Sequence, residues 1–186
     1  MNEVQRSNKI LEILNKIYPK TPIPLRHRNK FTLLVSVLLS AQTTDVNVNN
    51  VTKNIYPKYN QPKHFVKLGR KKIEKLIKSI GIFRVKAKSV YLLSKQLIEK
   101  HKGKVPQTFV ELEKLPGVGH KTASVVMAQG FGYPAFPVDT HIHRLAQRWG
   151  LTNGKNVIQT EKDLKRLFPK KYWNKLHLQI IYYGRE

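Results

Sequence analysis

Lys121 and Asp139 are the two side chains best placed for chemistry, because each stands beside backbone groups that can bind an anion. Lys121 follows a glycine-rich turn, residues 115–119 (Leu-Pro-Gly-Val-Gly). An apolar segment ends at Leu115 and a second one with helical periodicity begins at Ala123, so the sequence predicts a helix-hairpin-helix. Backbone N–H groups in such a turn, at the start of a helix, bind phosphate.

The chain between these two residues is long enough to bring them together. A helix over residues 119–130 would be about 18 Å long at about 1.5 Å per residue. The segment 131–138, which Pro134 and Pro137 favour as extended chain, can span roughly 26 Å. It can therefore run back along the helix and begin the next one at Asp139. We expect two helix N-termini, a lysine and a carboxylate in one cleft.

The composition indicates a polyanionic partner. The 186 residues include 35 Lys and Arg against 11 Asp and Glu, a net charge of +24. Such a basic balance is typical of proteins that bind nucleic acid, although codon bias in an AT-rich genome could also enrich lysine. There is no cysteine, which excludes disulfides, thiolate zinc sites and cysteine-ligated iron–sulfur clusters within these residues.

The sequence gives no indication of a membrane protein. Its longest apolar run, residues 33–39, is too short to span a bilayer, and the N-terminus lacks the apolar core of a signal peptide. We therefore expect a cytoplasmic, nucleoid-associated protein with no membrane partner. The length allows a proper core in one chain, so we expect a monomer.

Helical periodicity runs through the whole chain and predicts an all-α fold. No stretch alternates with period two for long enough to form a convincing strand. Residues 31–41 are apolar nearly all round, which indicates a helix at the centre of the core. Proline and glycine separate the expected helices, which cover residues 4–18, 31–41, 45–56, 62–68, 70–80, 84–101, 108–115, 119–130, 139–149, 156–168 and 172–183.

Four motifs, in register along nearly the whole chain, resemble the endonuclease III branch of the helix-hairpin-helix DNA glycosylases. They cover residues 38–45 (Leu-Leu-Ser-Ala-Gln-Thr-Thr-Asp), 80–87, 115–123 and 138–144. A glycine hairpin alone is weak, because many proteins use one only to hold DNA backbone. Together with Lys121 and Val-Asp-Thr-His it is highly specific. The resemblance implies two helical lobes, residues 22–133 and residues 1–21 plus 134–186, with a DNA-binding cleft between them.

The resemblance further implies base-excision DNA repair on double-stranded DNA that contains damaged bases or abasic sites. The neutral amine of Lys121 would displace a flipped-out, oxidised or ring-damaged pyrimidine at the sugar C1′ and form a Schiff base. β-Elimination would then break the strand. Asp139 would activate the attacking group and stabilise the cationic sugar. Because lysine is normally protonated at neutral pH, we expect a helix N-terminus and partial burial to favour the neutral amine.

Several more residues acquire roles from the same motifs. Gln42 would fill the gap left by the extruded nucleotide, and Ile82 would be an apolar wedge where the family usually has leucine. His141 would reach into the DNA near the lesion. The other implied DNA contacts are Gly117, Val118, Gly119, His120 and Thr140, and the implied substrate-pocket residues are Ser40, Thr44 and Asp45.

Each of these residues also has an ordinary structural interpretation. Lys121 could simply touch a phosphate, and Asp139 could be a helix N-cap. Ile82 could be a hydrophobic contact beside a helix end, and residues 40–45 could be a helix end with a capping box. The two histidines at 141 and 143 would face different directions on a helix, so we expect no metal site.

The chain departs from the family pattern in two places. Family members usually continue into a loop whose four cysteines hold a [4Fe-4S] cluster, whereas this sequence stops at Glu186 and has no cysteine. We therefore expect no cluster, in a chain that is either naturally cluster-free or shortened. His120 replaces the arginine expected before the lysine, which would weaken one phosphate contact.

Two other functions stay open at this point. A mismatch-type glycosylase acting on uracil or adenine would share the fold, but relatives that lack the lysine are monofunctional, so Lys121 argues against it. A non-catalytic helix-hairpin-helix module would use the hairpin only to clamp DNA backbone.

Overall fold

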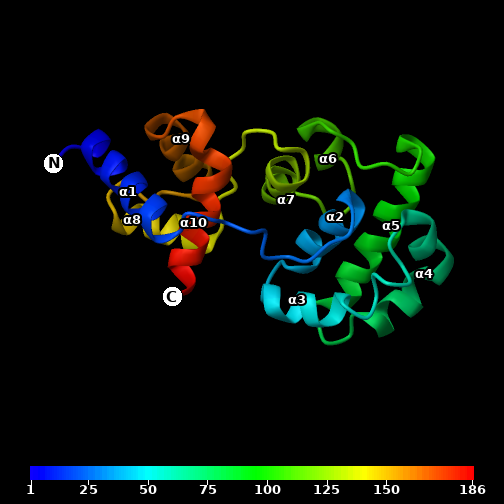
Figure 1. Ribbon diagram of the computed structural model, residues 1–186. Coiled ribbons are helices and arrows are strands. Elements are labelled where there is room, and N and C mark those ends of the chain that lie inside the picture. Colours follow the sequence, from blue (N-terminus) through cyan, green and yellow to red (C-terminus); the bar gives the residue numbers. More distant parts are fainter. The chain divides into compact units, whose positions relative to one another are not determined.

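The computed structural model describes all 186 residues, which form ten α-helices, one π-helical segment and one 3-10 helix (Figure 1). No strand is present, and the predicted all-α class is confirmed. In chain order the elements are α1 (Glu3–Ile17), α2 (Lys30–Leu39), α3 (Asp45–Thr52), α4 (Pro62–Leu76), α5 (Phe83–His101), α6 (Phe109–Glu113), α7 (His120–Val125), η1 (Val126–Gly130, π), α8 (Thr140–Arg148), α9 (Val157–Leu167), η2 (Lys170–Tyr172, 3-10) and α10 (Trp173–Arg185).

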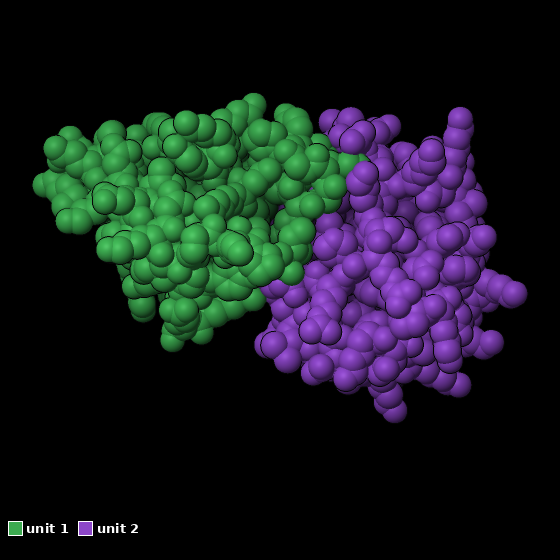
Figure 2. All heavy atoms as spheres, in the orientation of Figure 1, with its two compact units in different colours: residues 1–23, 127–186 green, residues 24–126 purple.

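The helices divide into two compact units, which Figure 2 colours separately. Unit 1 comprises Met1–Ile23 and Met127–Glu186, and unit 2 comprises Pro24–Val126. The sequence places its lobe boundaries after residues 21 and 133, so the second boundary differs by several residues. The role of the two lobes as the walls of one binding cleft stays a prediction.

Unit 2 is built around α2, whose residues from Phe31 to Leu39 are all buried. A helix without a polar face must be covered on every side, and α3, α5 and α7 each contact it. Its start is fixed by a reciprocal cap. The Asn29 side chain accepts a hydrogen bond from the Thr32 N–H (2.8 Å), and the Thr32 hydroxyl oxygen accepts one from the Asn29 N–H (3.0 Å).

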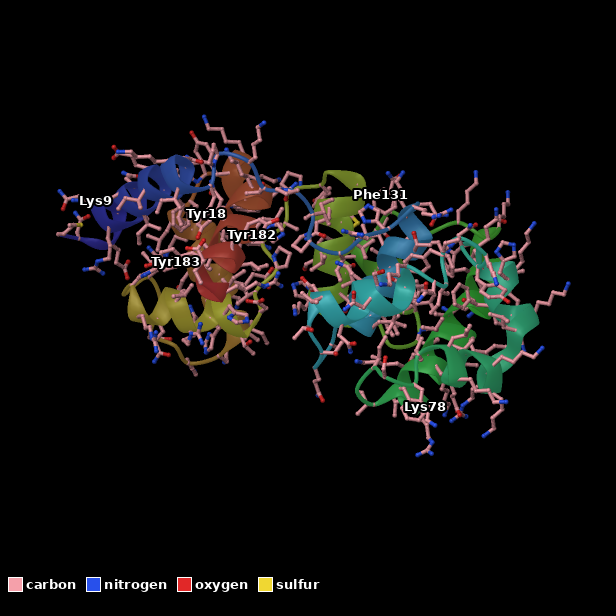
Figure 3. All side chains as sticks on the ribbon, turned by 60° about the horizontal axis from the view of Figure 1, so that its bottom comes forward. Lys9, Tyr18, Lys78, Phe131, Tyr182 and Tyr183 are labelled. Carbon is pink, nitrogen blue, oxygen red and sulfur yellow. The ribbon has the colours of Figure 1, made fainter.

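Unit 1 joins the two ends of the chain. Its core includes residues of α1, α8, α9 and α10, namely Leu14, Phe136, Val138, Ile142, Leu145, Ala146, Leu151, Leu164, Leu167, Phe168, Leu176 and Ile180. The buried Gln179 of α10 donates hydrogen bonds to the carbonyls of Leu14 (3.3 Å) and Tyr18 (3.0 Å), at the end of α1. The Tyr18 ring also stacks on Tyr182 at 5.9 Å between centroids (Figure 3). The N-terminal helix is therefore held by the C-terminal one.

Three helices end four or more residues before the predicted position. The helix that begins at Asp45 ends at Thr52 and continues as turns, not as a helix to Tyr56. The helix expected to Ile80 ends at Leu76, although the predicted break is present at Gly69 (φ 77°). The helix expected over 119–130 is α-helical only to Val125, because its last residues take the wider π-helical hydrogen bonding.

No helix combines the length and the apolar character needed to cross a membrane.

His177 is a buried histidine of unit 1 whose pKa differs between the folded and the unfolded chain. It lies in α10 and is fully buried, and its Nδ1–H donates to the Trp173 carbonyl (3.1 Å). Burial lowers the pKa of His177 from 6.5 to about 4, because desolvation disfavours the imidazolium. The Trp173 carbonyl and the charge of Asp139 act in the opposite direction and are weaker. The folded protein therefore holds this side chain neutral.

We expect this histidine to make the fold sensitive to mild acid. Between pH 6.5 and about 4 the unfolded chain binds a proton that the folded chain does not, so the free energy of unfolding falls as pH decreases through that window. The full effect of one such shift is about 3 kcal/mol. Urea unfolding at pH 7 and pH 4.5 should show a smaller loss in His177→Gln than in the wild type.

The exposed His27 provides the control, because His27→Gln should keep the wild-type pH dependence. Identical pH dependence in wild type and His177→Gln would contradict the assignment of this acid sensitivity to His177.

Candidate active site and nucleic-acid interface

The predicted helix-hairpin-helix is present in unit 2. Helix α6 ends at Glu113, and the turn that follows packs Leu115 and Val118 into the core. The Val118 N–H donates to the Leu115 carbonyl (3.1 Å), which closes the turn. Gly117 has a positive φ of 77°, and a Cβ at this position would lie 2.8 Å from the Cβ of Ser89. The first glycine of the motif is therefore required by packing and by backbone conformation together.

The second glycine has a different environment. Gly119 is the N-cap of α7 with φ −94°, and a Cβ built on it would meet no atom within 4 Å. No side chain caps this helix, so the N–H groups of its first turn have no intrahelical acceptor and no capping oxygen. Packing does not require a glycine here, and a side chain would only cover the exposed amides. This is the arrangement that a backbone anion site needs.

Lys121 is the second residue of α7, and its side chain is exposed. The partial burial expected from the sequence is wrong for this structure, because α7 buries Ala123 and Ser124 and leaves the lysine side chain exposed. Its amine has no ion-pair or hydrogen-bond partner. The lysine is therefore available to a ligand at the open helix start.

Asp139 is the N-cap of α8 in unit 1. Its Oδ1 accepts a hydrogen bond from the Ile142 N–H (2.8 Å), and its side chain is half-buried. The cap uses one carboxylate oxygen and leaves Oδ2 outside the cap. The structural interpretation of Asp139 is therefore correct as far as the helix is concerned, and it is compatible with a second role. Asp139 and Lys121 belong to different units, so their proximity stays a prediction.

The residues after Asp139 differ in their exposure and in their contacts. Thr140 is exposed. His141 is half-buried and lies against Gly184, where a Cβ would come within 3.1 Å of the His141 Cβ. His143 contacts the Thr160 hydroxyl at 2.8 Å. The two histidines thus have separate surroundings, and no group of three or more potential ligands in the chain could hold a metal ion.

His120 is held by the hairpin itself. Its Nδ1 lies 2.8 Å from Glu113 Oε1, and its ring stacks on Phe109 at 5.8 Å between centroids. Both partners come from α6, so His120 links the two helices of the motif. Its predicted phosphate contact would have to be made next to a carboxylate.

Gln42 and Ile82 are both exposed, and both have left-handed backbone conformations, with φ of 59° and 50°. Such a conformation is uncommon for any residue other than glycine and is an outlier for a β-branched one. The sequence contains no signal for it. The two turns are adjacent within unit 2, since a Cβ on Gly81 would lie 3.5 Å from the Gln42 carbonyl oxygen.

The three predicted pocket residues occupy the end of α2 and the start of α3. The Ser40 hydroxyl donates to the Val37 carbonyl (2.7 Å), and Thr44 caps α3 by accepting from the Asn47 N–H (3.1 Å). Asp45 is the first residue of α3. Their helix-end interpretation is therefore correct in part, although Thr44 makes a simple cap and not the expected capping box.

One residue near these turns is missing from the sequence-based list. Lys86 is buried in α5, and its ammonium donates to the carbonyls of Leu39 (2.8 Å) and Ala41. A signal for it exists in the sequence, because Lys86 shares the helix face of Val90, Leu93 and Leu97, which are all buried. A lysine on the apolar face of a helix needs an internal partner.

The comparisons with known proteins agree with this geometry. Residues 35–170 match the family model described as "HhH-GPD superfamily base excision DNA repair protein". The chain belongs to this superfamily.

Endonuclease III proteins are similar to the chain over nearly its whole length. The Rickettsia prowazekii protein is 43% identical over 98% of this chain and 86% of its own, and the Bacillus subtilis protein is 44% identical over 94% and 80%. A solved structure of a trapped endonuclease III–DNA covalent intermediate superposes with a TM-score of 0.96 at 41% identity, covering 100% of this chain and 87% of that one.

These similarities confirm the predicted family, fold class and enzyme class: the chain is a DNA glycosylase of base excision repair of the endonuclease III type. The family's [4Fe-4S] cluster does not fit the residues present. Thiolate ligands are lacking throughout the chain, and its histidines and carboxylates form no alternative ligand group.

The two glycines of this HhH-GPD hairpin should respond differently to substitution. Gly117→Ala should lower the free energy of unfolding by about 1–3 kcal/mol, because φ is positive and Ser89 is too close. Gly119→Ala should leave it within about 0.5 kcal/mol of the wild type. Its added methyl group should instead weaken DNA binding, measured by fluorescence anisotropy at fixed salt. Equal losses of stability in the two variants would overturn this distinction.

Proposed function

We propose that the enzyme excises oxidised or ring-damaged pyrimidines from double-stranded DNA and then cleaves the abasic site through a Schiff base on Lys121. The observation that carries the proposal is the exposed, unpaired lysine at the uncapped start of α7, in a chain 41% identical to an endonuclease III that has been trapped covalently on DNA. A covalent DNA intermediate requires a nucleophile, and a lysine amine beside a backbone phosphate site meets that need.

In the first step the lone pair of the neutral Lys121 amine attacks C1′ of the flipped-out nucleoside. The C1′–N glycosidic bond breaks, and the base leaves with the bonding electron pair and takes up a proton. The C1′–O4′ bond then breaks as the nitrogen lone pair forms the protonated imine between Nζ and C1′, and O4′ takes up a proton. Loss of a C2′ proton then expels the 3′ phosphate, which breaks the strand by β-elimination.

Asp139 has two tasks in this scheme. The oxygen that is not used in the helix cap accepts the proton that Lys121 loses, and the negative charge of the carboxylate stabilises the cationic sugar in the transition state. Because Lys121 is exposed, bound DNA has to supply the exclusion of water that the protein alone does not.

We propose that the remaining predicted residues hold the DNA around this centre. Gly117, Val118 and Gly119 bind a phosphate through their N–H groups, with His120 and Thr140 beside the backbone. Gln42 and Ile82 enter the duplex, and His141 approaches the lesion. Ser40, Thr44 and Asp45 line the base pocket.

The other functions considered from the sequence are less well supported. A uracil- or adenine-specific mismatch glycosylase would not need the lysine, and the relatives at 43% and 44% identity are endonuclease III proteins. A non-catalytic clamp would not need an unpaired lysine at the open helix start.

We also propose that the 186-residue chain acts as a monomer in the cytoplasm, associated with the nucleoid, and without an iron–sulfur cluster. The absence of cysteine supports the last point. A purified sample should lack the broad visible absorbance of such a cluster, and a brown sample would contradict it.

Borohydride trapping tests the chemistry directly. Wild-type protein incubated with duplex DNA carrying an abasic site and then reduced should give a covalent complex, and Lys121→Ala should give none. Lys114→Ala removes another exposed lysine of the same hairpin and should trap as the wild type does. No complex with the wild type would overturn the lyase assignment.

Asp139→Asn separates catalysis from folding. Asparagine caps helices as well as aspartate does, so the free energy of unfolding should change by less than about 0.5 kcal/mol. Loss of the charge should lower the rate of base excision by a factor of about 100 or more. A duplex panel with both base release and nicking scored gives this rate and identifies the preferred lesion.

A further inference from the structure

Two strained turns lie side by side on unit 2 and carry the two exposed side chains assigned to the DNA duplex. Gln42 follows α2 and Ile82 precedes α5, and both have positive φ. Ile82 is 52% exposed, so its own packing does not maintain this conformation. Such a conformation is energetically unfavourable for a residue other than glycine and persists only where its surroundings determine it. Something other than these two side chains therefore holds the turns.

Lys86 contacts both turns. Its ammonium donates to the carbonyls of Leu39 and Ala41, directly before Gln42. Its backbone N–H donates to the carbonyl of Ile82 (3.1 Å). The main-chain bond is the ordinary i→i−4 bond of the first turn of α5. The side-chain bonds of Lys86 link this helix start, and with it the Ile82 turn, to the segment before Gln42.

The environment of Lys86 is unusual for a lysine. The residue is 3% exposed, and no carboxylate pairs with it. Burial lowers the pKa of Lys86, because desolvation disfavours the ammonium. The carbonyls it binds are at the C-terminal end of α2, where the helix dipole favours a positive charge. Filling the space would need only an apolar side chain, so packing alone does not explain a lysine.

A second, independent bond crosses between the same segments. The Asn47 amide of α3 donates to the Thr43 hydroxyl (3.1 Å) and to the Ser79 carbonyl (3.2 Å). Thr43 follows Gln42 directly, and Ser79 belongs to the turn that leads to Ile82. Two polar side chains from different helices therefore join this pair of turns.

We propose that Lys86 is a positioning residue of the glycosylase, which fixes the Gln42 turn against the Ile82 turn so that the two side chains enter DNA as a pair. We call the side-chain hydrogen bonds that join these two turns the tie, and those of Asn47 form its weaker part. The proposal rests on the proposed function in one respect, the entry of Gln42 and Ile82 into the duplex. The tie between the turns is a property of the protein alone and can be tested without DNA.

Amide hydrogen exchange measured by NMR tests the tie. Lys86→Met keeps the length of the side chain and removes its donors. The hydrogen-bonded N–H groups of Ala41, Thr43 and residue 86 should exchange about tenfold faster or more, since the variant loses the buried side-chain hydrogen bonds that hold this segment. The amide of Ala123 in α7 should be unchanged. The control is Lys88→Met, which alters an exposed lysine of the same helix.

A double-mutant cycle tests the functional role. In the wild-type background Lys86→Met should lower single-turnover base excision from duplex DNA by about tenfold or more. In an Ile82→Gly background, where the wedge is already removed, the same change should cost less than about twofold. A structural role unrelated to the wedge would lower excision by the same factor in both backgrounds, and this result would overturn the proposal.

Asn47→Ala covers the case in which Lys86→Met does not fold. It removes the partly exposed hydrogen bonds of Asn47. Amide exchange at Ala41 and Thr43 should again be faster, by a smaller factor than in Lys86→Met. The effect on base excision should again be smaller in the Ile82→Gly background than in the wild type. Unchanged exchange at Ala41 and Thr43 in all tie variants would also overturn the proposal. If exchange changes as expected but the wild type neither excises bases nor traps on DNA, the proposed function fails and the tie remains.

Discussion

Much of this structure depends on how the backbone groups at helix ends are satisfied. The first N–H groups and the last carbonyls of a helix have no partner within it. Most helix starts in the chain are closed by a side chain, as Asn29 closes α2 and Asp139 closes α8. Helices α4, α5, α7 and α10 have no side-chain cap, and of these only α7 has a glycine, Gly119, at its N-cap. The amides left open by this glycine are next to the lysine to which we assign the chemistry. The candidate site is thus a helix start that the protein itself leaves unsatisfied.

The same constraint explains why a buried lysine is found behind the turns of Gln42 and Ile82. Helix α2 is buried on all sides, so its last carbonyls cannot be satisfied by solvent. Lys86 reaches them from α5 and in doing so connects α2 to the Ile82 turn. The same hydrogen bonds satisfy the carbonyls at the end of α2 and, in our proposal, orient the exposed side chains of Gln42 and Ile82. Under the proposed roles of Gln42 and Ile82, core packing and DNA recognition are coupled in unit 2.

Much of the helix pattern could be predicted from the sequence, because apolar periodicity and breaker residues are local signals. The isolated break at Gly69, the all-round apolar α2 and the hairpin turn at Gly117 all follow from such signals. Helix ends were predicted less accurately where two hydrogen-bonding patterns of similar energy compete at the last turn. The π-helical end after Val125 and the early end of α3 at Thr52 are of this kind.

The sequence by itself determined the fold class, the family and the identity of the candidate nucleophile, because these depend on residue types and on spacing along the chain. Only the tertiary structure decided that Lys121 is exposed, that Gly119 is not required by packing, and that Gln42 and Ile82 have left-handed backbones. It also decided the hydrogen bonds of Lys86, whose partners at residues 39 and 41 lie more than forty positions away. Exposure, strain and long-range hydrogen bonds arise from which surfaces meet, and that information is not contained in any local stretch of sequence.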